Sequence, residues 1–245
     1  MVSNQNIPAE LTHITISDLK KCSKAFIQKE QRGYIYPDAL NKVQNNFGTP
    51  DKICEGISDL LRGWHNNFYR FGPFDQAKIL KSINHYHDQL KGWRTKNIRN
   101  VRLDSKSKFV TQFSPIFDCF LDATAGKNPK FTRRTVTGTS KCLHLLAPSL
   151  FPMCDEAISQ AYDCWWVYSD FGFIEYIKFM KSMKILAEQL VDQYSKTHNI
   201  QNPNRAEMRL ANEIKAYSGD TYQYNKSLLK IIDEYNYAKY TKSWC

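Results

Sequence analysis

The sequence lacks the short motifs that mark several large classes of enzyme. It contains no P-loop and no GxGxxG segment, so nothing in it supports nucleotide hydrolysis or redox chemistry with a dinucleotide. HExxH motifs, DxDxDG loops and clusters of cysteine and histidine are missing as well. We therefore expect no zinc site, no calcium site and no cofactor.

Long apolar runs and CxxC pairs are also lacking. No stretch approaches the roughly 18 apolar residues of a membrane span, and the first residues do not resemble a secretion signal. The seven cysteines form an odd set without CxxC spacing, which favours reduced thiols. From these features we expect a soluble cytoplasmic monomer without a membrane partner.

Acidic residues are scarce between residues 91 and 141. This segment has three acids against twelve bases and so carries +9 of the formal net charge of +10. Basicity confined to one region is typical of a phosphate-binding face, and the alternative is a solvated surface without a partner. The twelve bases are Lys91, Arg94, Lys96, Arg99, Arg102, Lys106, Lys108, Lys127, Lys130, Arg133, Arg134 and Lys141.

Helical periodicity recurs along the chain, whereas strand signals are few. The pattern predicts an all-α protein in two parts, an N-terminal helical part over residues 1–124 and a second helical part over residues 125–245. Residues 91–104 are expected to form a loop, and Pro115 is expected to kink or restart its helix. Helices are expected over residues 17–31, 37–48, 50–70, 79–90, 109–120, 140–146, 156–165, 173–194, 205–217 and 224–240.

Residues 130–158, KFTRRTVTGTSKCLHLLAPSLFPMCDEAI, combine several signals of a functional segment. Residues 135–140 predict a tight turn around Gly138, where consecutive N–H groups could hold a phosphate. A short helix should follow and stop at Pro148. Asp155 then stands where the N-cap of the next helix is expected.

The order of turn, helix, proline-containing loop and helix-opening aspartate resembles the helix-hairpin-helix DNA glycosylase superfamily. By this resemblance Gly138, Thr139 and Ser140 match the hairpin that grips the DNA backbone. Lys141 matches the lysine nucleophile, and Asp155 matches the catalytic aspartate. Over about thirty residues the segment is similar to a bacterial branch of glycosylase-like proteins, which implies roles in DNA repair or antiviral defence.

The chemistry of base excision explains why such residues would be useful together. Cleaving an N-glycosidic bond develops positive charge on the sugar, which a carboxylate stabilises, and a deprotonated lysine can attack the anomeric carbon. The base must first leave the helical stack and enter an aromatic pocket, for which Tyr162, Trp165 and Trp166 are the candidates. DNA is thus the expected partner, with Arg133 and Arg134 contacting it beside the hairpin.

The resulting hypothesis is a DNA glycosylase that excises a hypermodified phage base or an oxidised purine. One alternative is a non-catalytic DNA-binding module that uses the hairpin for phosphate contacts. Another is a helical interaction domain for an acidic protein partner. At single residues, Asp155 is also explained by helix capping alone, and His144 is expected to be a hydrogen-bonded core histidine.

Overall fold

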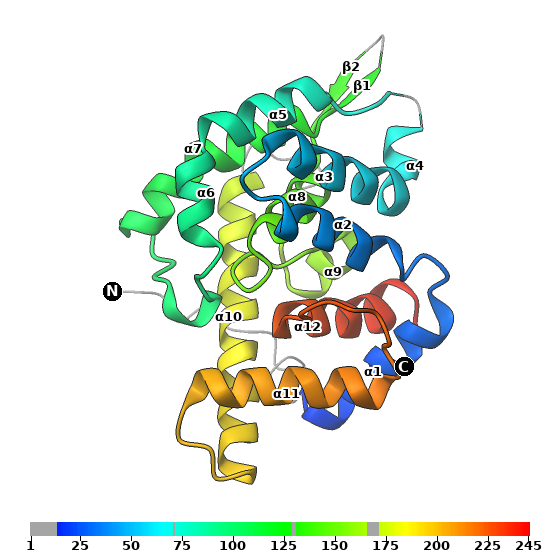
Figure 1. The fold of residues 1–245 in the computed structure, drawn as a ribbon, viewed down its shortest axis with the longest axis vertical. Helices are drawn as coiled ribbons and strands as arrows, with labels where there is room; N and C mark the ends of the chain where they lie inside the picture. Colours follow the sequence, from blue (N-terminus) through cyan, green and yellow to red (C-terminus); the bar gives the residue numbers. More distant parts are fainter. Residues whose placement is uncertain (1–13, 71, 129–130, 166–171) are drawn as a thin grey trace.

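The computed structural model describes residues 14–70, 72–128, 131–165 and 172–245, and these residues form a mainly α-helical protein (Figure 1). The all-α prediction is confirmed. The described strands are β1 (Gly126–Asn128) and β2 (Phe131–Arg133), which pair antiparallel with Gly126 opposite Arg133. At residues 127, 128 and 131–133 only the backbone is described.

The first half of the chain forms helices that follow the predicted periodicity, with four differences. The helix expected over residues 50–70 breaks at His65, and the one expected over residues 79–90 divides at Tyr86. The expected loop over residues 91–104 is partly helical, and one helix runs through Pro115 without a restart. Because Pro115 is exposed, water can take the hydrogen bond that its missing N–H leaves unmade. The elements are α1 (Ile16–Lys29), α2 (Ile35–Asn45), α3 (Pro50–Trp64), α4 (Asn66–Tyr69), α5 (Gln76–His85), α6 (His87–Trp93), the 3-10 turn η2 (Ile98–Asn100) and α7 (Lys108–Ala123).

The second half contains α8 (Val136–Leu146), α9 (Glu156–Ala161), α10 (Gly172–Thr197), α11 (Pro203–Ser218), α12 (Leu228–Asn236) and the π-turn η3 (Tyr237–Thr241). Local capping explains several of these ends. Asn202 accepts hydrogen bonds from the first turn of α11, and Gly219 ends that helix with a φ of 74°. The single helix expected over residues 224–240 is instead two elements, α12 and the π-turn η3, which begins at Tyr237.

Helix α8 occupies the centre of the molecule. All eleven of its residues are buried, and it contacts α2, α3 and α7. In Figure 1, α10 runs from behind the centre of the molecule to its lower end, where α11 crosses it. The buried apolar residues of all these helices form one cluster that runs across the expected boundary between residues 124 and 125. The division into two parts at that boundary stays a prediction.

The cysteines differ from the expectation of seven free thiols. Cys22 on α1 and Cys245 form a disulfide with a Cα–Cα separation of 5.4 Å, while the other five are free. The two residues lie 223 positions apart and meet because α1 packs against α12 and η3. No local spacing in the sequence could indicate this pairing. As to membranes, none of the described helices combines the length and apolar character that a span requires.

Candidate functional site

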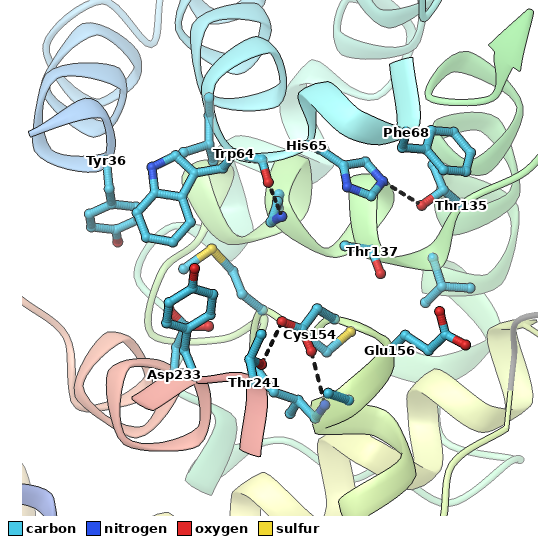
Figure 2. Close-up of a pocket in the computed structure, with 18 of the residues that line it drawn as sticks. Tyr36, Trp64, His65, Phe68, Thr135, Thr137, Cys154, Glu156, Asp233 and Thr241 are labelled. Atoms are coloured by element: carbon cyan, nitrogen blue, oxygen red, sulfur yellow. Dashed lines mark hydrogen bonds between the residues drawn. The ribbon is translucent and has the colours of Figure 1, made fainter. Parts of the chain in front are cut away.

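A cavity of about 530 Å³ opens between the end of α3, α4, the start of α8, α9 and the α12–η3 segment (Figure 2). Its volume lies within the usual range of small-molecule sites. Its lining combines aromatic rings, four cationic side chains and three carboxylates. The lining residues are Arg32, Tyr36, Leu60, Trp64, His65, Phe68, Arg134, Thr135, Val136, Thr137, Lys141, Met153, Cys154, Asp155, Glu156, Ala157, Ile158, Gln160, Lys230, Asp233, Tyr237 and Thr241.

Lys141 reaches this cavity from the second turn of α8. The residue is only 8% exposed, and its Nζ donates a hydrogen bond to the carbonyl oxygen of Trp64 at 3.0 Å. Burial lowers the pKa of the Lys141 ammonium, and the nearby carboxylates of Asp155 and Asp233 oppose this effect. A lowered pKa increases the fraction of the uncharged amine, which is the nucleophilic form of lysine.

Asp155 reaches the same cavity from the start of α9. Its Oδ1 accepts a hydrogen bond from the Ile158 N–H at 2.9 Å, so the predicted N-cap is confirmed. Its Oδ2 accepts a second hydrogen bond from the Thr241 hydroxyl at 2.8 Å. The capping role therefore occupies one carboxylate oxygen, while the other turns towards η3.

The fold thus brings Lys141 and Asp155 to one cavity. No direct ion pair joins these two described residues, although Asp155 is the strongest charge acting on the Lys141 ammonium. A cavity with an amine and a carboxylate on its lining has the parts for nucleophilic attack and for stabilising a developing cation.

The aromatic walls come from residues that sequence reasoning did not select. In Figure 2 all four lie along the upper edge of the cavity, Tyr36 and Trp64 towards the left and His65 and Phe68 towards the right. The His65 and Phe68 rings stack with their centroids 4.7 Å apart. Because residues 50–70 were expected to form one continuous helix, the break at His65 that turns these rings towards the cavity was missed. The density of aromatic residues at positions 64–69 was the available signal.

Of the expected base-pocket residues, Tyr162 and Trp165 do not line this cavity. Tyr162 is buried, with its hydroxyl bonded to Asn236 Oδ1 at 2.8 Å and its ring against Phe179. Trp165 is 61% exposed. Proximity to Asp155 in sequence was misleading because α9 ends at Ala161 and the chain then reverses through Asp163, whose φ is 54°. Trp166 lies outside the described residues.

The expected hairpin around Gly138 is also wrong. Thr135 caps α8 by accepting a hydrogen bond from the Gly138 N–H at 3.1 Å, so the helix begins at Val136 and includes Gly138, Thr139 and Ser140. All three are buried, and the hydroxyls of Thr139 and Ser140 donate to carbonyl oxygens of the preceding turn. Gly138 is explained by close packing, since a Cβ there would lie 2.7 Å from the Tyr69 hydroxyl. Phosphate contacts by these side chains are thereby excluded in this conformation.

The basic segment does not form a single face. Arg134 is exposed at the cavity, where it pairs with Asp122 at 2.8 Å, whereas the Arg133 side chain lies outside the described part. Arg94 packs on Phe47 and Arg99 pairs with Glu207. Five further cations lie between α6 and the start of α7, and none of them is among the described residues that line the cavity. These are Lys91, Lys96, Arg102, Lys106 and Lys108, all exposed.

A second group of charges borders the cavity on α12. Lys230 Nζ pairs with Asp233 Oδ2 at 2.7 Å and lies over the ring of Tyr36 at 4.7 Å from its centroid. Lys230 and Asp233 both line the cavity, and both are almost fully buried. Arg32 lies over the Trp64 ring at 5.1 Å and donates to the Tyr237 hydroxyl at 3.1 Å. The cavity therefore has fixed charges next to its aromatic walls.

The described residues contain no cluster of three or more His, Cys, Asp or Glu side chains placed to hold a metal ion. Comparison of the chain with protein-family models, with curated proteins and with solved structures found no match.

Proposed function

We propose that this protein is a DNA glycosylase that binds a flipped, modified base in the cavity and releases it from the sugar. The observation that carries the proposal is the meeting of Lys141 and Asp155 at one cavity with aromatic walls. A volume of about 530 Å³ has room for a base with a substituent. The modified base is a hypermodified phage base or an oxidised purine.

The proposed reaction uses the uncharged Lys141 amine as nucleophile. Its Nζ forms a bond to C1′ of the deoxyribose while the glycosidic C–N bond breaks, and the bond electrons leave with the base, which takes up a proton. Loss of the amine proton and opening of the sugar ring then give a Schiff base. Asp155 stabilises the positive charge that develops on the sugar during bond cleavage. Trp64 and Phe68, which are partly exposed and line the cavity, supply aromatic surface against which a flipped base can stack.

Borohydride trapping tests this reaction directly. Duplexes that carry modified bases are incubated with the protein and with borohydride, and covalent adducts are separated by denaturing electrophoresis. We expect an adduct with the wild type and none with Lys141→Ala, because the Schiff base needs the Lys141 amine. Asp155→Asn should lower the rate by roughly 100-fold, a typical loss for one electrostatic group.

Lys184→Ala is the matched control for the trapping experiment. Lys184 is partly buried and donates to the Val101 carbonyl oxygen at 2.8 Å, as Lys141 donates to Trp64, but it lies on α10 and does not line the cavity. The control should trap like the wild type. Base release without a trapped adduct would show that water, and not Lys141, attacks C1′. The absence of base release from every duplex would contradict the glycosylase proposal.

The alternative of a non-catalytic DNA-binding module relied on the hairpin residues, which are buried in α8. We assign the DNA contact at the cavity to Arg134 instead. Arg134→Ala should weaken duplex binding and reduce the slope of log affinity against log salt by about 0.9, the value for one phosphate contact. Lys196→Ala is the control, because Lys196 is exposed in a comparable surface pair with Asp192. Equal salt slopes for Arg134→Ala and wild type would contradict this assignment.

A further inference from the structure

The Asp155 carboxylate is held by two elements that are far apart in the chain. Its Oδ1 is bonded to the Ile158 N–H within α9, and its Oδ2 to the Thr241 hydroxyl at the end of η3, 86 residues later. Figure 2 shows Thr241 at this edge of the cavity. Since each oxygen is bonded to a different element, rotation of the carboxylate would break at least one hydrogen bond. Its orientation therefore depends on where η3 lies.

The π-turn η3 also supplies part of the cavity wall. It follows α12 directly and carries Tyr237, which lines the cavity. The Tyr237 hydroxyl donates to Glu30 Oε2 at 2.9 Å and accepts from Arg32 at 3.1 Å. A displacement of η3 would thus move Tyr237 in the cavity wall and would also move the Thr241 hydroxyl away from Asp155.

The chain after Thr241 folds back over η3 and is tied to α1. The Lys242 N–H donates to the Tyr237 carbonyl oxygen at 3.0 Å, and the Trp244 N–H donates to the Ala238 carbonyl oxygen at 2.7 Å. Cys245 then forms the disulfide with Cys22 of α1. Helix α1 is itself anchored to α11 by the Lys20–Glu213 pair at 2.6 Å. The disulfide consequently attaches the exit of η3 to a helix that is held independently.

We propose that Thr241 is a positioning residue for the Asp155 carboxylate and that the Cys22–Cys245 disulfide makes this positioning redox-dependent. A dithiol reductant cleaves the Sγ–Sγ bond, giving two cysteine thiols, while the dithiol is oxidised to its own disulfide. The exit of η3 then loses its covalent attachment to α1 and is held there by noncovalent contacts alone. The importance of this for catalysis rests on the proposed glycosylase function, but the coupling between Thr241 and Asp155 does not.

A double-mutant cycle measures the coupling without any substrate. Asp155→Ala, Thr241→Val and the double variant are unfolded in denaturant, with and without a dithiol. Without the dithiol, we expect the two substitutions to be non-additive in their shift of the unfolding free energy, because they share one hydrogen bond. With the dithiol, they should become additive. Cys22→Ser should reproduce the reduced result without any dithiol, since the other five cysteines are free.

Each result of the cycle is decisive for one half of the proposal. Additivity in the oxidised protein would overturn the positioning role of Thr241. Equal coupling in oxidised, reduced and Cys22→Ser protein would overturn the redox dependence. Should Asp155→Ala fail to fold, hydrogen exchange of the η3 amides in oxidised and reduced wild type replaces it. Faster exchange at Thr241 after reduction is expected, and unchanged exchange would overturn the redox dependence.

Base release separates positioning from a purely structural role. On a duplex that the wild type cleaves, Thr241→Val should lower kcat by roughly 10-fold or more with KM within about twofold, because misplacing a reacting group slows the chemical step. Thr241→Ser keeps the hydroxyl and should restore kcat. Unchanged kcat in Thr241→Val would overturn the positioning role. A wild type without base release would contradict the glycosylase function alone, and the mutant cycle would still decide the role of Thr241.

Discussion

At the scale of single residues, His144 shows how a titratable side chain can belong to the core. Its Nδ1 lies 2.7 Å from the Phe151 carbonyl oxygen and its Nε2 lies 2.7 Å from the Tyr36 hydroxyl. A carbonyl oxygen only accepts, so Nδ1 donates to Phe151 and Nε2 accepts from Tyr36. The expectation of a hydrogen-bonded core histidine is confirmed. Burial lowers the pKa of His144 to about 4.

His144 should therefore make the protein sensitive to acid. Its pKa falls from an ordinary 6.5 to about 4 on folding, so the unfolded chain binds the proton first as pH falls. The free energy of unfolding is therefore unaffected by the titration of His144 above about pH 6.5 and decreases as the pH falls from 6.5 towards 4. The total decrease is about 3 kcal/mol. Urea unfolding between these pH values should show a shallower acid loss for His144→Gln than for wild type. Parallel curves would contradict the assignment.

At the scale of elements, α8 begins with small residues because neighbouring groups approach it closely. Gly138 faces the Tyr69 hydroxyl, which is itself held by a hydrogen bond to the Thr124 carbonyl oxygen at 2.8 Å. The signal that the sequence offers at Gly138 is real, but its cause is packing in a helix and not a turn. Pattern reasoning predicted a glycine requirement at the right residue and assigned it to the wrong structure.

Gly138→Ala should destabilise the protein although alanine favours helices. The new Cβ would lie 2.7 Å from the Tyr69 hydroxyl and 2.9 Å from Thr135 Cγ2, and overpacking of this kind costs about 1–3 kcal/mol. Helix propensity offsets up to about 1 kcal/mol of that cost. Gly92→Ala is the control, because Gly92 lies in α6 with nothing within 4 Å of its added Cβ. Thermal unfolding should show a lower Tm for Gly138→Ala and an equal or higher Tm for Gly92→Ala.

At the scale of the whole molecule, a buried set of charges joins α12 to α1 and to the end of α11. Lys226 Nζ pairs with Asp220 Oδ2 at 2.9 Å and with Glu234 Oε2 at 2.8 Å, and all three side chains are at most 1% exposed. Ser23 of α1 donates to the same Glu234 carboxylate. These contacts hold α12 in place, and with it the Lys230–Asp233 pair that borders the cavity.

Lys226→Met should strongly destabilise the fold. It leaves two buried carboxylates without their shared cation, and breaking a buried pair in this way costs about 3–5 kcal/mol. Lys196→Met removes an exposed pair with Asp192 and should cost less than about 1 kcal/mol. Free energies from urea unfolding at neutral pH provide the comparison. Similar small losses for both variants would show that the buried pair contributes no more than a surface one.

The local features of this protein are determined by the sequence alone. Apolar periodicity predicts most of the helices, and the N-cap preference of aspartate predicts Asp155 at the start of α9, because hydrogen bonds within a turn and the 3.6-residue repeat act between near neighbours. The pairing of Lys141 with Asp155 comes instead from the resemblance of residues 130–158 to the glycosylase superfamily. Tertiary structure alone decided that His65 ends α3 beside the cavity and that Thr241 bonds Asp155. These depend on packing between segments tens to hundreds of residues apart, which leaves no short-range pattern in the chain.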